Sequence, residues 1–400
     1  MPASVTLKPG KDQSLRRLHP WVFSGAIARL QGEVTEGEPV RVLAANGEQL
    51  GVGHFAPGSI AVRMLDFGPD AQLPDAAFWE TRLRNAYQLR ESLGLTGTTP
   101  TAPGATNVYR LAHAEGDGLP GLIIDVYGDV AVVQAHSAGM YHARPHIARA
   151  LQAVVPGLRA IYDKSAETVP AKAVPGAQNG YLLGEGTGQE HLVHENGLPF
   201  AVDWETGQKT GFFIDQRDNR QLLARYAPGR RVLNTFCYTG GFSSYALAAG
   251  AELVHSVDSS KKAIELTNRN AELTGHAARH AAFADDVFNF LKTSPDAYDL
   301  IVLDPPAFAK HLSARHNALM GYKRLNVAGI RQVAPGGLLF TFSCSQVVSM
   351  ELFEGAVLAA AIEAGRPARI LHRLTQPADH PVSLFHPEGE YLKGLVLAVE

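Results

Sequence analysis

The chain has 400 residues, 46% of them hydrophobic, which is enough for two or three domains with ordinary cores. No apolar run is long enough to span a membrane. No apolar run follows the N-terminal basic residues either, as it would in a secretory signal, so a cytoplasmic protein is expected. The formal net charge of −3 argues against binding nucleic acid by charge alone, and the two cysteines exclude a disulfide framework and a zinc site, so no metal is predicted.

Residues 1–72 are predicted to form a small β domain. Turn signals at Asn46-Gly47 and Pro57-Gly58 separate the strand-like runs. These runs are residues 39–43, 49–55 and 60–65.

A local basic face occurs near the N-terminus and consists of Lys8, Lys11, Arg16 and Arg17. Such a face could contact RNA phosphates, although composition alone favours an ordinary solvated surface. The aromatic run 19–25 that follows is open to two interpretations. It could form a platform for nucleic acid, but for Trp21 and Phe23 we expect a hydrophobic plug under a small barrel.

Residues 73–190 are predicted to form a small α/β domain. Its first helix, expected at 78–92, is followed by a loop rich in Thr, Gly and Pro at 96–105. A hairpin is expected around the turn Gly128-Asp129, with strands at 122–127 and 130–135. A helix at 143–154 and a strand at 160–163 follow.

Residues 191–400 are predicted to form the last domain, which opens with a hairpin around Asn196-Gly197. A polar loop, 205–217, comes next and leads into a helix at 218–226. Because it directly precedes the central strand, this loop could lie across a cofactor pocket, and its pair Phe212-Phe213 makes a fully exposed connection less plausible.

The central stretch of this domain is 231–258, which reads as strand, glycine turn, helix and strand. Such a βαβ unit begins a doubly wound sheet, where ligands bind at the carboxyl ends of the strands. The turn Thr239-Gly240-Gly241 lacks the G-x-G-x-x-G dinucleotide fingerprint. S-adenosylmethionine fits this turn, with Asp258 on the ribose and the cofactor carboxylate at the helix N-terminus. The alternative is an ordinary turn, with Asp258 capping the next helix.

The sheet is expected to continue beyond this unit. A helix is predicted at 260–274, capped by Ser259 or Ser260. One of Asp285 and Asp286 could accept a hydrogen bond from an adenine amino group, and the other is expected to cap the following helix. Apolar runs predict the fourth and fifth strands at 298–303 and 337–342.

Two candidate catalytic residues follow these last two strands. Asp304 opens the motif Asp-Pro-Pro-Ala-Phe, in which two prolines stiffen the loop, and this motif is typical of methyltransferases that act on nucleobases. Cys344 follows the fifth strand and should reach the same crevice. A lone cysteine is more often a packing residue, which is the interpretation we give Cys237 in the glycine turn.

A cysteine beside a fixed acid suits carbon methylation of a pyrimidine. Cytosine C5 is a poor nucleophile, but attack of the Cys344 thiolate on C6 makes it an enamine carbon. The thiolate requires a lowered pKa or a nearby base. The Asp304 carboxyl group at N3 would stabilise the charge that develops there.

The chain resembles the bacterial 23S ribosomal RNA cytosine-C5 methyltransferases that carry an N-terminal PUA domain. The resemblance runs nearly end to end. It rests on HPWVFSGA (19–26), GDGLPGLIID (116–125), GQKTGFFIDQRDNR (207–220), NTFCYTGGFS (234–243), DPPAF (304–308), GYKRLN (321–326), TFSCS (341–345) and ADHP…PEGEYLKG (378–394).

This resemblance implies a PUA domain, a small α/β middle domain and a class I methyltransferase domain with a Rossmann-like sheet. It implies that Cys344 is the nucleophile and Asp304 its acidic partner. It also places near S-adenosylmethionine the residues Gln216, Phe236, Tyr238, Gly240, Asp258 and Asp286. The implied partner is 23S ribosomal RNA or the large-subunit particle, with the target base flipped out of its stack.

Other functions remain open from the sequence. An RNA methyltransferase acting on a guanine nitrogen could share the fold and would need no cysteine adduct. A ribosome-assembly factor could use the fold as a scaffold, although the glycine turn, Asp258 and Asp304 argue against this. Lys323 is a candidate for contact with RNA or with the cofactor, and the alternative is an ordinary surface lysine. A homodimer is one arrangement that the sequence leaves open.

Overall fold

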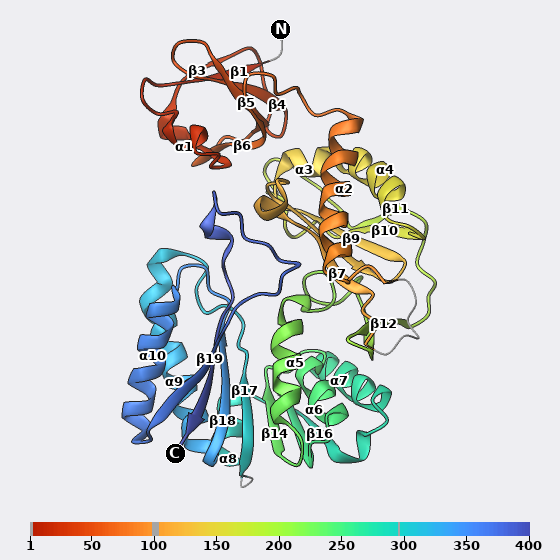
Figure 1. Cartoon of the computed structure of the whole chain (residues 1–400), viewed down its shortest axis with the longest axis vertical. Coiled ribbons are helices and arrows are strands. Elements are labelled where there is room, and N and C mark those ends of the chain that lie inside the picture. Colours follow the sequence, from red (N-terminus) through yellow and green to blue (C-terminus); the bar gives the residue numbers. More distant parts are fainter. Residues whose placement is uncertain (1–2, 98–103, 295–296) are drawn as a thin grey trace. The chain divides into compact units, whose positions relative to one another are not determined.

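The computed structural model describes residues 3–97, 104–294 and 297–400 (Figure 1). The chain forms two compact units. The first contains the residues up to Val193 together with Val202–Phe212 and Ala378–Gly389, and the second contains His194–Ala201, Phe213–Pro377 and Glu390–Glu400. Most of the predicted loop 96–105 lies outside the described residues.

The first unit begins with a curled six-stranded sheet in the order β2-β6-β5-β4-β1-β3 (Figure 1). Its strands are β1 (Ser4–Leu7), β2 (Trp21–Phe23), β3 (Ile27–Gln31), β4 (Pro39–Leu43), β5 (Gln49–Phe55) and β6 (Ile60–Phe67), and α1 (Gln13–Arg16) follows β1. The three predicted strands are therefore confirmed. Val5, Val40, Val62 and their neighbours form the core of this sheet.

The prediction that Phe23 plugs this domain is wrong, because 48% of its surface is exposed. Side chains alternate between the two faces of a strand. In β2 the buried residue is Val22, which is 2% exposed, so its neighbours Trp21 and Phe23 point away from the core. Trp21 is partly buried and donates from its indole nitrogen to Oε1 of Glu115 at 2.8 Å.

The rest of the first unit is built on a five-stranded sheet in the order β11-β10-β9-β8-β7. Its strands are β7 (Val108–His113), β8 (Leu122–Tyr127), β9 (Val130–Ala135), β10 (Ala160–Asp163) and β11 (Gly180–Leu183). The helices are α2 (Ala76–Ser92), α3 (Ala138–His142) and α4 (Arg144–Val154). The hairpin at Gly128-Asp129 and the two predicted helices are confirmed. The hairpin at Asn196-Gly197 is confirmed as well, with β12 (His191–Glu195) paired to β13 (Leu198–Val202).

The second unit is a doubly wound α/β sheet in the order β16-β15-β14-β17-β18-β20-β19. The strands are β14 (Arg231–Thr235), β15 (Leu253–Asp258), β16 (His280–Ala284), β17 (Tyr298–Leu303), β18 (Val333–Ser343), β19 (Ala368–Leu374) and β20 (Lys393–Val399). The first five are parallel to one another, whereas β20 runs antiparallel to both β18 and β19. The strand order reverses between β14 and β17, which is where such sheets bind ligands.

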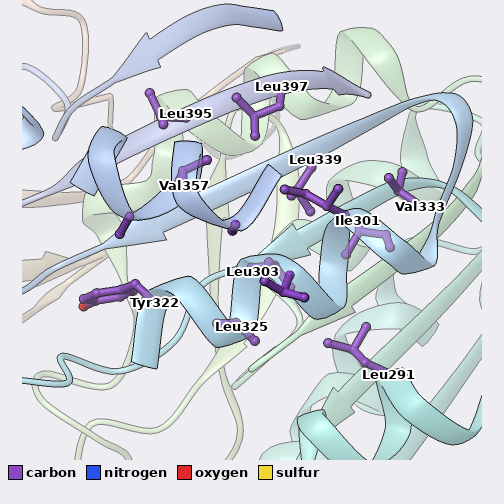
Figure 2. Packing of buried hydrophobic residues seen from close by; sticks show 14 of the residues in the cluster. Leu291, Ile301, Leu303, Tyr322, Leu325, Val333, Leu339, Val357, Leu395 and Leu397 are labelled. Atoms are coloured by element: carbon purple, nitrogen blue, oxygen red, sulfur yellow. The ribbon is translucent and has the colours of Figure 1, made fainter. Parts of the chain in front are cut away.

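Helices cover both faces of this sheet (Figure 1), and they are α5 (Arg217–Tyr226), α6 (Gly241–Ala248), α7 (Lys261–Leu273), α8 (Val287–Thr293), α9 (Arg315–Gln332) and α10 (Met350–Ala364). Alternate residues of β17 belong to two separate cores. Ile301 and Leu303 pack with the side chains of α9 and α10 (Figure 2), whereas Leu300 and Val302 join the core that contains α5 and α6. The predicted α/β fold class is therefore confirmed, and β17, which is apolar apart from Asp299, is buried on both faces.

Candidate active site

The glycine turn between β14 and α6 has an unusual backbone. Phe236, Tyr238 and Gly240 all have positive φ angles, of 52°, 46° and 75°. Such angles are rare for residues other than glycine and are associated with functional sites. A Cβ atom at Gly240 would lie 2.8 Å from Cγ2 of Thr267, so this position requires glycine for space as well as for conformation.

Helix α7 fixes the shape of this turn. Thr267 donates from Oγ1 to the carbonyl of Tyr238 at 2.7 Å, and Asn270 donates from Nδ2 to the carbonyl of Thr239 at 2.8 Å. Buried carbonyl groups need such partners. The turn therefore keeps one shape, with the N-terminus of α6 beginning at Gly241.

Asp258 ends β15 beside this turn, as predicted. Its Oδ2 accepts from the backbone N–H of Tyr238 at 3.0 Å, and its Oδ1 accepts from that of Ser260 at 2.9 Å. The N-cap of α7 is Ser260, whose side chain accepts from the N–H of Ala263, so Asp258 does not cap the helix. A carboxylate oxygen has more than one acceptor site, and Asp258 can therefore still bind two hydroxyl groups.

The two acidic residues after β16 have different partners. Asp286 is exposed and caps α8, because its Oδ1 accepts from the N–H of Asn289 at 2.9 Å. Asp285 accepts from Nδ2 of the same Asn289 at 3.1 Å. Asp286, which the family resemblance assigned to the cofactor, is thus the capping residue of the pair.

Asp304 follows β17 and is held by a chain of amides. Gln216 donates from Nε2 to Oδ2 of Asp304 at 3.0 Å, and Asn219 donates from Nδ2 to Oε1 of Gln216 at 2.7 Å. Burial, assisted by the nearby Asp215, raises the pKa of Asp304 to about 7, although the Gln216 hydrogen bond acts in the opposite direction. This carboxyl group can therefore serve as an acid or a base near neutral pH.

The sequence did not indicate any role for Asp215. Tyr391 donates from its hydroxyl group to Oδ2 of Asp215 at 2.7 Å. The other oxygen, Oδ1, is buried and has no hydrogen-bond partner among the residues that the structure describes. The ring of Phe213, two residues earlier, lies edge-on to Tyr238 with centroids 5.0 Å apart. The end of the predicted loop 205–217 thus lies against the glycine turn.

Cys344 follows β18 and is partly buried. Its Sγ lies 3.9 Å from the carbonyl oxygen of Pro305, so the thiol reaches the loop that carries Asp304. Burial, together with the carboxyl groups of Asp304 and Asp215, raises the pKa of Cys344 to about 12. Without ligands the thiol is therefore protonated at neutral pH, although a nucleophile must lose its proton.

Cys237 provides an internal comparison. It is 6% exposed, burial raises its pKa to about 12, and its Sγ lies 3.6 Å from Oγ1 of Thr267. It lies within the turn, where the predicted packing role accounts for its burial.

The residue after Cys344 is anchored from two directions. Tyr322 of α9 lies with its hydroxyl group 2.9 Å from Oγ of Ser345, and the backbone N–H of Ala309 donates to the same oxygen at 3.3 Å. Lys393, which opens β20, donates from Nζ to the carbonyl of Ser345 at 2.7 Å and to that of Tyr391 at 2.6 Å. The segment that carries Cys344 therefore has a fixed position.

The candidate RNA-binding residues are spread over both units. Lys8, Lys11, Arg16 and Arg17 are exposed in the first unit. Arg16 already pairs with Asp12 and Glu48, and Lys8 donates to the carbonyl of Gly25 at 2.9 Å. Lys323 of α9 pairs with Glu363 of α10 at 2.6 Å in the second unit. Ion pairs between exposed side chains, such as these, contribute little to the stability of the fold.

One group of potential metal ligands occurs among the described residues, consisting of His19, His386 and Glu388. The backbone N–H of Trp21 donates to Nδ1 of His19 at 3.2 Å. Nδ1 of His19 is therefore an acceptor, and in the neutral ring its proton lies on Nε2, the nitrogen that faces Glu388. With that proton in place His19 offers no lone pair to an ion, so this group is a polar cluster.

The arrangement fits S-adenosylmethionine. Asp258 has acceptor sites left for ribose hydroxyl groups, the N-terminus of α6 offers backbone N–H groups, and the last two residues of the turn, Gly240 and Gly241, have no side chains. A doubly wound sheet with such a turn defines the class of S-adenosylmethionine-dependent methyltransferases. The family described by that name matches residues 167–383, and a PUA-like domain matches residues 5–67.

Curated relatives extend this likeness over the whole chain. "Ribosomal RNA large subunit methyltransferase I" of Aeromonas hydrophila subsp. hydrophila and of Tolumonas auensis are each 42% identical, and each alignment covers 99% of both chains. That of Shewanella amazonensis is 40% identical over the full length of both. The chain therefore belongs to a family of S-adenosylmethionine-dependent methyltransferases with a PUA-like domain, whose curated members are called ribosomal RNA large subunit methyltransferase I. Its cofactor is S-adenosylmethionine.

Solved structures show the same fold. A SAM-dependent methyltransferase from Streptococcus mutans has a TM-score of 0.82 at 22% identity, covering 99% of both chains. A methyltransferase solved in complex with SAH has a TM-score of 0.83 at 23% identity, again over 99% of both. In the described part of the chain, no helix combines the length and apolar character needed to cross a membrane.

Proposed function

We propose that this methyltransferase forms 5-methylcytosine in 23S ribosomal RNA through a covalent bond between Cys344 and C6 of the base. The observation that carries the proposal is the approach of Cys344 Sγ to the Pro305 carbonyl, which brings a thiol beside the loop of Asp304. Relatives of the chain are named for ribosomal RNA of the large subunit. As substrate we propose this RNA, free or in the large-subunit particle, and as location the cytoplasm.

The cofactor would be held by Asp258, by the turn from Phe236 to Gly241 and by Gln216, with Asp286 at the edge of the adenine site. Bound there, S-adenosylmethionine supplies an electrophilic methyl group. The turn has no side chain at Gly240, so the backbone of α6 is accessible to a carboxylate.

The reaction begins at Cys344. The thiol releases its proton to solvent, and the thiolate forms a bond to C6 of a flipped cytosine. The protonated form of Asp304 donates to N3, which takes up the electron pair displaced from the C5–C6 double bond. C5 then has the electron density of an enamine carbon and can be methylated. The C5 proton passes to solvent water, the C6–S bond breaks to release the Cys344 thiolate and restore the aromatic ring, and N3 returns its proton to Asp304.

A second candidate, methylation of a guanine nitrogen, is favoured by one observation. Burial and two carboxyl groups raise the pKa of the Cys344 thiol to about 12, which is opposite to what a nucleophile needs. A nitrogen already carries a lone pair, so such a reaction would need only Asp304 and the Asp-Pro-Pro loop.

The identity of the methylated nucleoside tests the proposal. Ribosomal RNA from cells lacking the enzyme would be incubated with it and methyl-labelled S-adenosylmethionine, digested to nucleosides and analysed by mass spectrometry. We expect the label in 5-methylcytidine from the large-subunit RNA. Label in a methylguanosine would establish the second candidate, and label in small-subunit RNA alone would exclude the proposed substrate.

A further inference from the structure

Lys393 is a buried lysine at an unusual position. It is the first residue of β20, in an otherwise apolar run, and only 3% of its surface is exposed. In the antiparallel pairing of β18 with β20 it lies opposite Ser343, the residue before Cys344. Lysine is almost never fully buried unless it is paired, so a burial of this kind needs an explanation.

The partners of Lys393 are carbonyl groups. Its Nζ donates to the backbone oxygens of Ser345 and Tyr391, at 2.7 and 2.6 Å. No carboxylate forms an ion pair with it among the residues that the structure describes. An ammonium group has three protons to donate, and its charge is not cancelled by a bonded anion. Burial lowers the pKa of Lys393 to about 8, against the opposing influence of Cys344 and Glu390.

The charges around Cys344 are otherwise unfavourable for a thiolate. Asp304 and Asp215 both raise the pKa of the thiol, and Lys393 is the cation that lowers it. Tyr322, whose hydroxyl group lies 2.9 Å from Oγ of Ser345, has its own pKa raised by burial and stays neutral. The cation lies on the β20 side of the thiol, while the two carboxyl groups come from the Asp-Pro-Pro loop and from the segment after Phe213.

We propose that Lys393 is a positioning residue for the Cys344 nucleophile, because its ammonium group holds the Ser345 carbonyl and places an unpaired positive charge where it stabilises the attacking thiolate. This inference rests on the proposed role of Cys344. The two bonds to carbonyl groups fix the segment that carries the thiol. The charge offsets the two carboxyl groups, so that the thiolate forms more readily than burial alone would allow.

The test is the rate at which iodoacetamide alkylates Cys344 in the full chain between pH 6 and 10, followed by peptide mass spectrometry. Three variants would be compared with wild type: Lys393→Met, Lys393→Arg and, as a control, the exposed Lys292→Met. We expect Lys393→Met to slow alkylation about tenfold at pH 7, since one pKa unit changes the thiolate fraction tenfold. Lys393→Arg should retain most of the rate because it retains the charge, and the control should match wild type.

The pH dependence separates charge from shape. Lys393 loses its own proton above about pH 8, so the difference between wild type and Lys393→Met should shrink as the pH rises beyond that value. A purely structural role would slow both Lys393 variants equally at every pH, and this result would overturn the proposal. So would a Lys393→Met protein that melts normally and is alkylated as fast as wild type.

Two further readouts complete the design. If Lys393→Met does not fold, wild type alone remains informative, because its alkylation rate should rise less steeply with pH above about 8 than below it, and a uniform slope would contradict the proposal. Cys237 is the internal standard, since its alkylation should not respond to Lys393. Alkylation requires no RNA, so a Lys393-dependent profile in an enzyme that forms no adduct with cytosine would refute the role of Cys344 and leave the electrostatic effect standing.

Discussion

Gln216 donates a hydrogen bond from its side-chain amide to Oδ2 of Asp304 at 3.0 Å, and so links the segment before α5 to the end of β17. This bond favours the ionised form of the carboxyl group, while burial favours the protonated form. The balance between these two effects sets the fraction of Asp304 that is protonated at neutral pH and can act as an acid.

The first prediction concerns this bond. In Gln216→Leu the pKa of Asp304 should rise, because the interaction that lowers it is lost. The alkaline limb of the pH profile of methyl transfer should then move to higher pH, and turnover should fall about tenfold as the carboxyl group loses its orientation. Asn219→Leu removes the support of Gln216, together with a longer hydrogen bond to the Thr375 carbonyl at 3.4 Å, and should give a smaller shift in the same direction. An unmoved alkaline limb in both variants would show that Asp304 does not act as the acid.

The second prediction concerns stability and Asp304. The folded-state pKa of about 7 lies above the ordinary value of 3.8, so between these values the folded chain binds a proton that the unfolded chain has lost. Stability from this group is therefore present at low pH and is lost as the pH rises toward 7, by up to about 4 kcal/mol. Asp304→Asn removes the titrating carboxyl group, and with it this loss of stability at higher pH. Its melting temperature should exceed that of wild type by more at pH 8 than at pH 5, whereas the exposed Glu265→Gln should show no such dependence.

The third prediction uses two glycines with positive φ angles. Gly240 has φ 75° and no room for a Cβ atom beside Thr267, whereas Gly250 has φ 94° and open space. Alanine at Gly250 should cost only the conformational penalty of about 1–2 kcal/mol. Alanine at Gly240 should cost more and should also weaken the binding of S-adenosylmethionine, measured by calorimetry, at least about tenfold. Equal effects of the two substitutions on cofactor binding would remove the glycine turn from the site.

Much of the second unit was predictable from the sequence, because the carboxyl ends of parallel strands meet at one edge of a sheet. This rule predicts that Asp258, Asp304 and Cys344 lie at the same edge, since each of them ends or follows a parallel strand. The βαβ stretch 231–258 formed as predicted, with β14 parallel to β15. The glycine turn was recognisable because it joins the first of these strands to its helix.

The rest depended on contacts that have no local signal. Lys393 and Tyr391 reach the site because β20 inserts antiparallel beside β18, and no periodicity in the sequence indicates that pairing. Asp215 lies within the motif at 207–220, but its proximity to Asp304 arises from the fold of the segment before α5. For Lys393, the sequence feature that could have indicated a role was its position at the edge of the apolar run 394–399. The face on which Phe23 lies was mispredicted because a three-residue strand is too short to show which of its faces is buried.

The central claim is that Cys344 bonds to C6 of cytosine, and the most direct measurement uses large-subunit RNA containing 5-fluorocytosine. Fluorine cannot leave C5 as a cation, so the adduct should be trapped once the methyl group is transferred. We predict a protein–RNA complex that survives denaturing electrophoresis, requires S-adenosylmethionine, maps to Cys344 and is absent from Cys344→Ala but present in Cys237→Ala. Absence of this complex, with RNA whose unsubstituted form is methylated by the same enzyme, would contradict the covalent mechanism.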